Sequence, residues 1–171
     1  ASRMGQETAA ATLLAAGAAA NEIDEIGRTP LMLAAGSGNA GLVAKLIAAG
    51  ADVGRRDAEG RTPLLHALQR CRIGAAHVLL DHNAAKVSDK FGNSPLHVAA
   101  RLCPDPLLFK KLIDGQDVNS ADAAGRTALW HAAMQGNAAL AAALIESGAR
   151  PDITDTDGFT PLHAAAAHGH A

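Results

Sequence analysis

A short motif recurs five times along this chain at an almost constant spacing. It reads Gly-x-Thr/Ser-x-Leu, and its glycines are Gly27, Gly60, Gly92, Gly125 and Gly158. Successive glycines are 33, 32, 33 and 33 residues apart, and an aspartate stands three residues before each of them. A period of this length limits the chain to architectures in which small, similar supersecondary units stack on one another.

The chemistry within one period predicts a turn followed by a helix. Asp57 and Gly60 bracket a tight turn, because an aspartate bonds its own following backbone and a glycine tolerates positive φ. Thr62 and Pro63 then form a helix start, with a capping hydroxyl before the proline that suits the first helical position. We therefore expect a hairpin tip and then a first helix in every repeat.

A second helix follows in each repeat. Leu140, Leu144 and Ile145 are spaced to place one apolar stripe toward the core. Glycine and asparagine best accept the left-handed conformation just beyond a helix end. The predicted ends of the second helices are Gly50, Asn83, Gly115 and Gly148.

With these features in place, the unit resembles the ankyrin repeat. The segment 158–170, Gly-Phe-Thr-Pro-Leu-His-Ala-Ala-Ala-Ala-His-Gly-His, is similar to that family's signature almost position by position. The resemblance covers residues 6–171 and implies an all-α solenoid of stacked antiparallel helix pairs with β-hairpin fingers. It also implies a module for protein–protein interaction, with scaffolding or signalling roles.

We predict a single domain over residues 1–171. It contains an N-terminal half repeat (6–26), four full repeats (27–59, 60–91, 92–124 and 125–157) and a truncated C-terminal repeat (158–171). The half repeats lack obvious polar caps, so we expect a piece of a longer natural array or of a larger protein. The alternative function is accordingly a regulatory or positioning domain of a larger enzyme or channel.

Charge and composition exclude several other classes. The formal net charge is −2 and the sequence pI is about 6.5, so no basic field favours nucleic acid. The alanine-rich apolar runs are too short for membrane insertion. Two cysteines form no disulfide framework, and we expect an intracellular location in the cytoplasm, with the nucleus as the alternative.

Histidine and cysteine carry no predicted chemistry. His97 and His163 stand at the signature Thr-Pro-Leu-His position, where we expect the ring to bond loop backbone and the Thr or Ser hydroxyl. The spacing of the eight histidines offers no zinc ligand set. Cys71 and Cys103 occupy similar positions in adjacent repeats, roughly 10 Å apart and beyond the roughly 7 Å reach of a disulfide, so we expect two free thiols.

No nucleophile with a base beside it and no phosphate-binding loop occurs in the sequence. We therefore predict no enzyme activity, no catalytic or metal site and no cofactor. Trp130 replaces the signature histidine of the fourth repeat. It either fills the space of the missing ring or serves as a partly exposed anchor for a partner.

Recognition is left to the finger tips and to the groove-facing ends of the first helices. We predict a partner protein or extended peptide, with an acidic segment favoured by a basic concave face over repeats two and three. The alternative is that these charges only keep the stack solvated. The predicted contact positions are Glu25, Ile26, Arg28, Arg56, Glu59, Arg61, Gln69, Arg70, Lys90, Phe91, Asn93, Arg101, Arg126, Met134, Gln135, Asp157 and Phe159.

Overall fold

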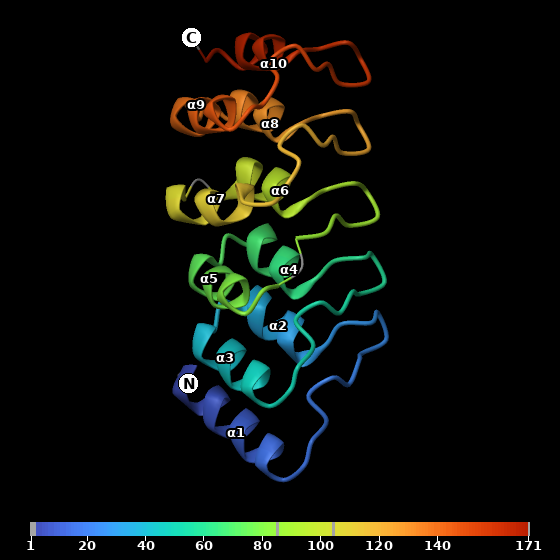
Figure 1. The fold of residues 1–171 in the computed structure, drawn as a ribbon. Helices are drawn as coiled ribbons and strands as arrows, with labels where there is room; N and C mark the ends of the chain where they lie inside the picture. The colour runs from blue at the N-terminus through green and yellow to red at the C-terminus, as the bar shows by residue number, and fades with distance from the viewer. Residues whose placement is uncertain (1–2, 85, 104, 171) are drawn as a thin grey trace. The chain divides into compact units, whose positions relative to one another are not determined.

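The computed structural model describes residues 3–84, 86–103 and 105–170, which form helices and connecting turns in two compact units. The N-terminal unit, residues 1–85, contains α1 (Arg3–Ala15), α2 (Pro30–Ser37), α3 (Ala40–Ala48), α4 (Pro63–Gln69) and α5 (Ile73–Asp81). The C-terminal unit, residues 86–171, contains α6 (Pro95–Leu102), α7 (Pro106–Ile113), α8 (Ala128–Met134), α9 (Ala138–Glu146) and α10 (Pro161–Ala167). Figure 1 shows the helix pairs of each unit, confirming the all-α repeat architecture.

The helix ends follow the predicted capping chemistry. Each first helix begins after a Thr or Ser whose hydroxyl accepts a hydrogen bond from the third helical amide; the caps are Thr29, Thr62, Ser94, Thr127 and Thr160. The four glycine and asparagine residues that follow the second helices have positive φ, including Asn83 at 57° and Gly148 at 91°. Local chemistry therefore sets the length of each helix.

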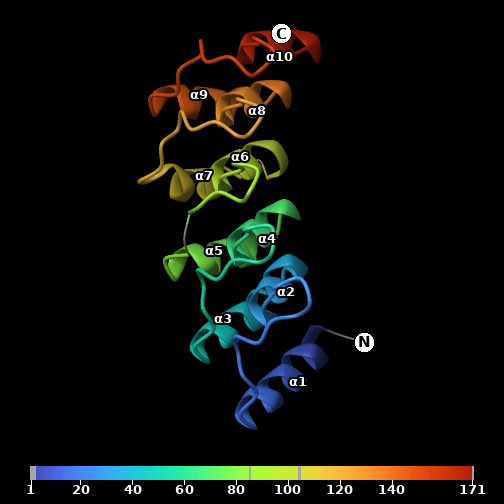
Figure 2. The same ribbon diagram turned by 90° about the vertical axis from the view of Figure 1, so that its right-hand side faces the viewer.

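Helix stacking buries an aliphatic core in each unit. In the N-terminal unit α2 packs on α4, and α3 lies between α1 and α5 in a second row (Figures 1 and 2). In the C-terminal unit α8 packs between α6 and α10, and the leucines Leu96 and Leu129 are buried. Leu140 and Leu144 are buried as predicted, but Ile145 is 52% exposed. One residue is 100° of helical rotation, so Ile145 turns away from the face that Leu144 fills.

The turns that precede the first helices project as fingers, which Figure 1 shows as loops along one side of each unit. Neighbouring fingers are joined by main-chain hydrogen bonds. Ala58 N donates to Ile26 O at 3.1 Å, Ala123 N donates to Phe91 O at 2.9 Å, and Thr156 N donates to Ala124 O at 2.9 Å. Within the described residues the only β bridge is the isolated pair Ala121 and Thr127, so each finger is a tight hairpin turn without a strand ladder.

The prediction of two free thiols is wrong, because neither Cys71 nor Cys103 is a free thiol in the structure. The prediction assumed equivalent backbone positions. Cys71 follows α4 with φ of 48°, in the left-handed region, whereas Cys103 caps α6 with φ of −135° and ψ of 78°. Equal spacing from the repeat glycine therefore does not give these side chains equal directions.

Contact with the neighbouring finger constrains Gly125 more than Gly148, although both glycines have positive φ. A β-carbon on Gly125 would lie 3.0 Å from Thr156 N, whereas one on Gly148 would have nothing within 4 Å. We expect Gly148→Ala to cost about 1 kcal/mol through backbone strain alone. Gly125→Ala should cost about 1–3 kcal/mol more, because the neighbouring main chain must move.

Urea unfolding followed by the fluorescence of Trp130, the single tryptophan in the chain, measures both glycine variants in the same unit. Equal losses of stability would show that the close approach of the fingers does not constrain Gly125.

Candidate functional site

A carboxylate stands at the centre of each finger. In the fourth repeat, Asp122 Oδ1 accepts hydrogen bonds from Ala124 N at 2.9 Å and Arg126 N at 3.0 Å. Its Oδ2 accepts from Arg126 Nε at 3.2 Å and His131 Nε2 at 3.1 Å. Burial alone would raise the pKa of Asp122, but these donors hold it below the usual value. The carboxylate thus stays ionised and fixes the turn.

The other fingers use the same centre with different donors. Asp57 accepts from Arg61 and His66 as Asp122 does from Arg126 and His131. Asp89 accepts instead from Asn93, through both its backbone and side-chain nitrogens. Each finger therefore has one framework, while the residues at its tip differ.

His97 and His163 behave as the signature predicts. Ser94 N donates to His97 Nδ1 at 3.1 Å, which leaves Nε2 to donate to Ser120 O at 2.9 Å. His163 Nδ1 contacts Thr160 Oγ1 at 2.8 Å. Burial lowers the pKa of His97, so its ring is a neutral structural element.

His131 is also neutral, although it touches a carboxylate. Its side chain is 1% exposed, and Nδ1 has no hydrogen-bond partner among the residues that the structure describes. Burial lowers its pKa to about 4, which the hydrogen bond to Asp122 opposes only in part. Protonating Nδ1 would bury an unpaired N–H donor, so the geometry also favours the neutral ring.

Trp130 packs at the base of the fourth finger and is half-buried. The Arg126 guanidinium lies 5.4 Å from the centre of its ring, and the edge of His131 meets it at a centroid distance of 5.4 Å. The indole Nε1 is buried, and no described residue accepts a hydrogen bond from it. The ring therefore fills space beside the finger, and its remaining exposed part adjoins the finger surface.

None of the predicted contact positions is buried, and they fall into three groups. The fingers carry Glu25, Ile26, Arg28, Glu59, Arg61, Lys90, Phe91, Asn93, Arg126, Asp157 and Phe159. The C-terminal ends of first helices carry Gln69, Arg70, Arg101, Met134 and Gln135. Arg56 lies just before the second finger, and its Nε donates to Gly60 O.

The cations among these positions differ in their pairing. Arg28, Arg61 and Arg126 each bond the aspartate of their own finger, and Arg61 also pairs with Glu59 at 2.7 Å. In the part of the chain that the structure describes, Arg70, Lys90 and Arg101 form no ion pair. These three keep their charge available to a partner.

Within the C-terminal unit, two predicted positions meet in one pocket. Arg101 and Gln135 line a hollow of about 490 Å³ together with Ala100, Leu102 and Asn137. None of these five residues is acidic. The pocket thus collects a guanidinium and two amide side chains where α6 and α8 end.

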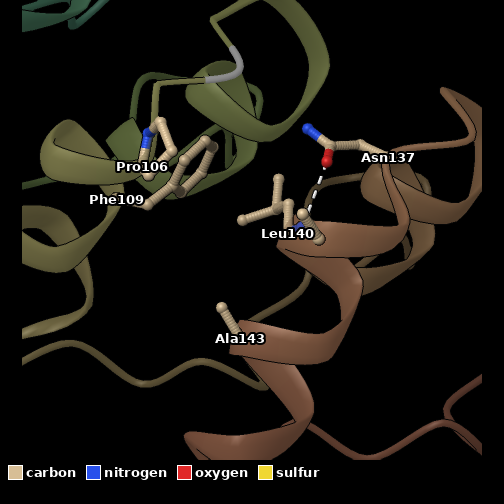
Figure 3. Close-up of a pocket in the computed structure, with 6 residues that line it drawn as sticks. Pro106, Phe109, Asn137, Leu140 and Ala143 are labelled. Atoms are coloured by element: carbon tan, nitrogen blue, oxygen red, sulfur yellow. Dashed lines mark hydrogen bonds between the residues drawn. The ribbon is translucent and has the colours of Figure 1, made fainter.

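A second pocket, which none of the sequence predictions included, is apolar and has a volume of about 200 Å³. Pro106 and Phe109 of α7 face Leu140 and Ala143 of α9 across it (Figure 3), and Ala139 also lines it. Asn137 lines this pocket too, and its side-chain oxygen accepts a hydrogen bond from Leu140 N at 3.0 Å. The signal available in the sequence was Pro106, which stands at the first position of α7 and lines the pocket.

With this geometry established, the comparisons identify the class of protein. A family model for ankyrin repeats in three copies matches residues 1–90, 37–106 and 96–171. The chain belongs to the ankyrin-repeat family. Ankyrin repeats are in general non-catalytic modules of protein–protein interaction.

Several curated proteins share this region. Neurogenic locus notch homolog protein 1 of Mus musculus is 34% identical over 164 residues, 95% of this chain and 5% of that protein. Ankyrin repeat protein nuc-2 of Neurospora crassa is 35% identical over 61% of this chain, and the ADP-ribosylation factor GTPase-activating protein AGD2 of Arabidopsis thaliana is 44% identical over 43%. The chain spans about a tenth of the length of the latter two proteins.

Two absences hold for the described residues alone. None of their helices is long and apolar enough to span a bilayer. They also contain no cluster of three or more His, Cys, Asp or Glu side chains arranged to hold a metal ion.

The buried His131 predicts a specific dependence of stability on pH. Its folded pKa of about 4 lies below the ordinary value of 6.5, so the unfolded chain binds the proton more tightly. The stabilisation is complete above pH 6.5 and is lost as the pH falls toward 4. Between pH 7 and pH 5 this residue alone should remove about 2 kcal/mol of stability.

The control for this pH effect is His131→Gln, which cannot titrate. Urea unfolding at pH 7 and pH 5 should give the variant a smaller loss than the natural chain, since His66 and His97 still titrate in both. An identical loss in the two proteins would mean that His131 does not titrate as its burial indicates.

Proposed function

We propose that this chain is a protein-binding module that holds a partner against its finger tips and the ends of its first helices. This proposal rests on the contrast between the constant framework of the fingers and the variable, exposed residues at their tips. Ile26, Phe91 and Phe159 are 49%, 57% and 49% exposed on turns fixed by aspartates. Rigid turns that present large apolar side chains to solvent suit recognition, because little conformational entropy is lost on binding.

The unpaired cations favour an acidic or extended partner segment. Among the described residues, Arg70, Lys90 and Arg101 pair with no carboxylate, whereas Arg61 is held by Asp57 and Glu59. A partner carboxylate would thus gain a charge-assisted hydrogen bond from Arg70, Lys90 or Arg101 without breaking an internal pair. An intracellular location in the cytoplasm or nucleus forms part of the same proposal.

Selection of a random peptide library on the chain, followed by fluorescence anisotropy of the selected peptides, tests this function. Phe91→Ala or Phe159→Ala should weaken the binding at least tenfold, as loss of an aromatic hot spot does. Selected sequences should be enriched in Asp and Glu.

Ile145→Ala is the matched control for the finger variants. Ile145 is 52% exposed, a fraction similar to the 57% of Phe91, but it lies on α9 and not on a finger. The affinity of the Ile145→Ala variant for the selected peptides should stay within about twofold of that of the natural chain. If Ile145→Ala weakens binding and the finger variants do not, recognition does not use the fingers.

A regulatory or positioning role within a larger enzyme or channel is the second candidate. It is favoured by relatives named as GTPase-activating proteins and as a palmitoyltransferase, of which this chain spans 10% to 13%. In such a protein, Phe91→Ala should change the activity of the remainder as well as the binding of a separate peptide. A change in binding alone would favour the first candidate.

A further inference from the structure

The apolar pocket exists because two second-row helices in the C-terminal unit do not pack closely. In the N-terminal unit α3 and α5 are in contact, and a β-carbon on Gly74 would lie 3.8 Å from the Cβ of Ala40. The equivalent positions of α7 and α9 hold Pro106 and Ala139, one and two residues after the respective caps. Pro106 and Ala139 have larger side chains than Ala40 and Gly74, so α7 and α9 approach each other less closely than α3 and α5. The gap between α7 and α9 is the apolar pocket.

The polar and apolar pockets adjoin at one residue. Asn137 caps α9 through its side-chain oxygen, which leaves its Nδ2 group as a donor, and it lines both hollows. On one side lie Arg101, which forms no ion pair among the described residues, and Gln135. On the other side lie Phe109 and Leu140. The cap also places the pockets at the positive end of α9, which attracts anions.

We infer that these adjoining pockets together bind a short partner segment that carries an acidic side chain next to an apolar or aromatic one. The carboxylate of the partner segment pairs with Arg101 and accepts hydrogen bonds from the side-chain amides of Gln135 and Asn137. The apolar side chain of the same segment fills the space between α7 and α9. This inference rests on the proposed interaction function. It adds a second contact surface, formed at the helix ends and not at the fingers.

The size of the apolar pocket favours one side chain of a polypeptide over a whole metabolite. A cavity of about 200 Å³ is smaller than the roughly 300–1,000 Å³ of ordinary small-molecule sites. A dry cavity of roughly 150 Å³ accepts a ligand the size of benzene, so this one accepts a single leucine or phenylalanine side chain. The charged half supplies orientation, because a guanidinium recognises a carboxylate through paired hydrogen bonds.

The test uses capped peptides in which Asp or Glu stands zero to three residues from Leu or Phe, titrated into the isotope-labelled chain. Amide shifts should gather at residues 106–109 and 137–143. Ala139→Leu, which fills the apolar pocket, should weaken binding at least tenfold, and Arg101→Gln should weaken acidic peptides at least fivefold while leaving Asn and Gln analogues unchanged. Ala142→Leu is the control, because Ala142 is exposed on α9 but does not line the pocket.

Thermal melting verifies that each variant folds, and Ala143→Met is a second way to fill the pocket. The inference is overturned if the peptides do not bind, if they shift other residues, or if both filling variants bind as well as the natural chain. Peptides that depend on Phe91 should be unaffected by Ala139→Leu. If the Phe91-dependent peptides bind the natural chain and the pocket peptides do not, this inference is overturned and the proposed function stands.

Discussion

The finger carboxylate is the interaction on which the remaining structure depends. In the fourth repeat one aspartate receives two main-chain amides, an arginine and a buried histidine, so it joins the turn to the first turn of α8. Without it, the turn would leave amide donors unsatisfied and His131 would have no acceptor. The ion pair with Arg126 also explains why an arginine follows the repeat glycine in three of five fingers.

Elements encoded within a few consecutive residues were predicted well from the sequence. The caps, the positive-φ residues and the turns all depend on contacts between neighbours in the chain, and Thr62 and Asn83 show them as expected. The roles of His97 and His163 were recognised because the family resemblance supplied a specific partner. The family itself was predicted correctly.

What the sequence did not reveal depends on distances between helices and on side-chain direction. Equal spacing suggested that Cys71 and Cys103 were equivalent, but their backbone angles differ. The pocket between α7 and α9 is set by Pro106 and Ala139, which belong to different repeats. Their effect becomes clear only when they are compared with Ala40 and Gly74, the residues at the equivalent positions of the N-terminal unit. Arg61 was predicted as a partner contact, but its pairing with Asp57 depends on the folded turn and was not predicted.

The hydrogen bonds between fingers give the tips a shared motion. Ala123 N is bonded to Phe91 O, and Ala124 O receives Thr156 N, so the fourth finger is held on both sides by main chain alone. A fluctuation that lifts one tip must break a hydrogen bond to the next finger, so restricting the motion of the backbone at Phe91 also restricts the fourth finger. If a partner binds at the fingers as proposed, contact with one finger lowers the entropy that the adjacent finger loses on binding.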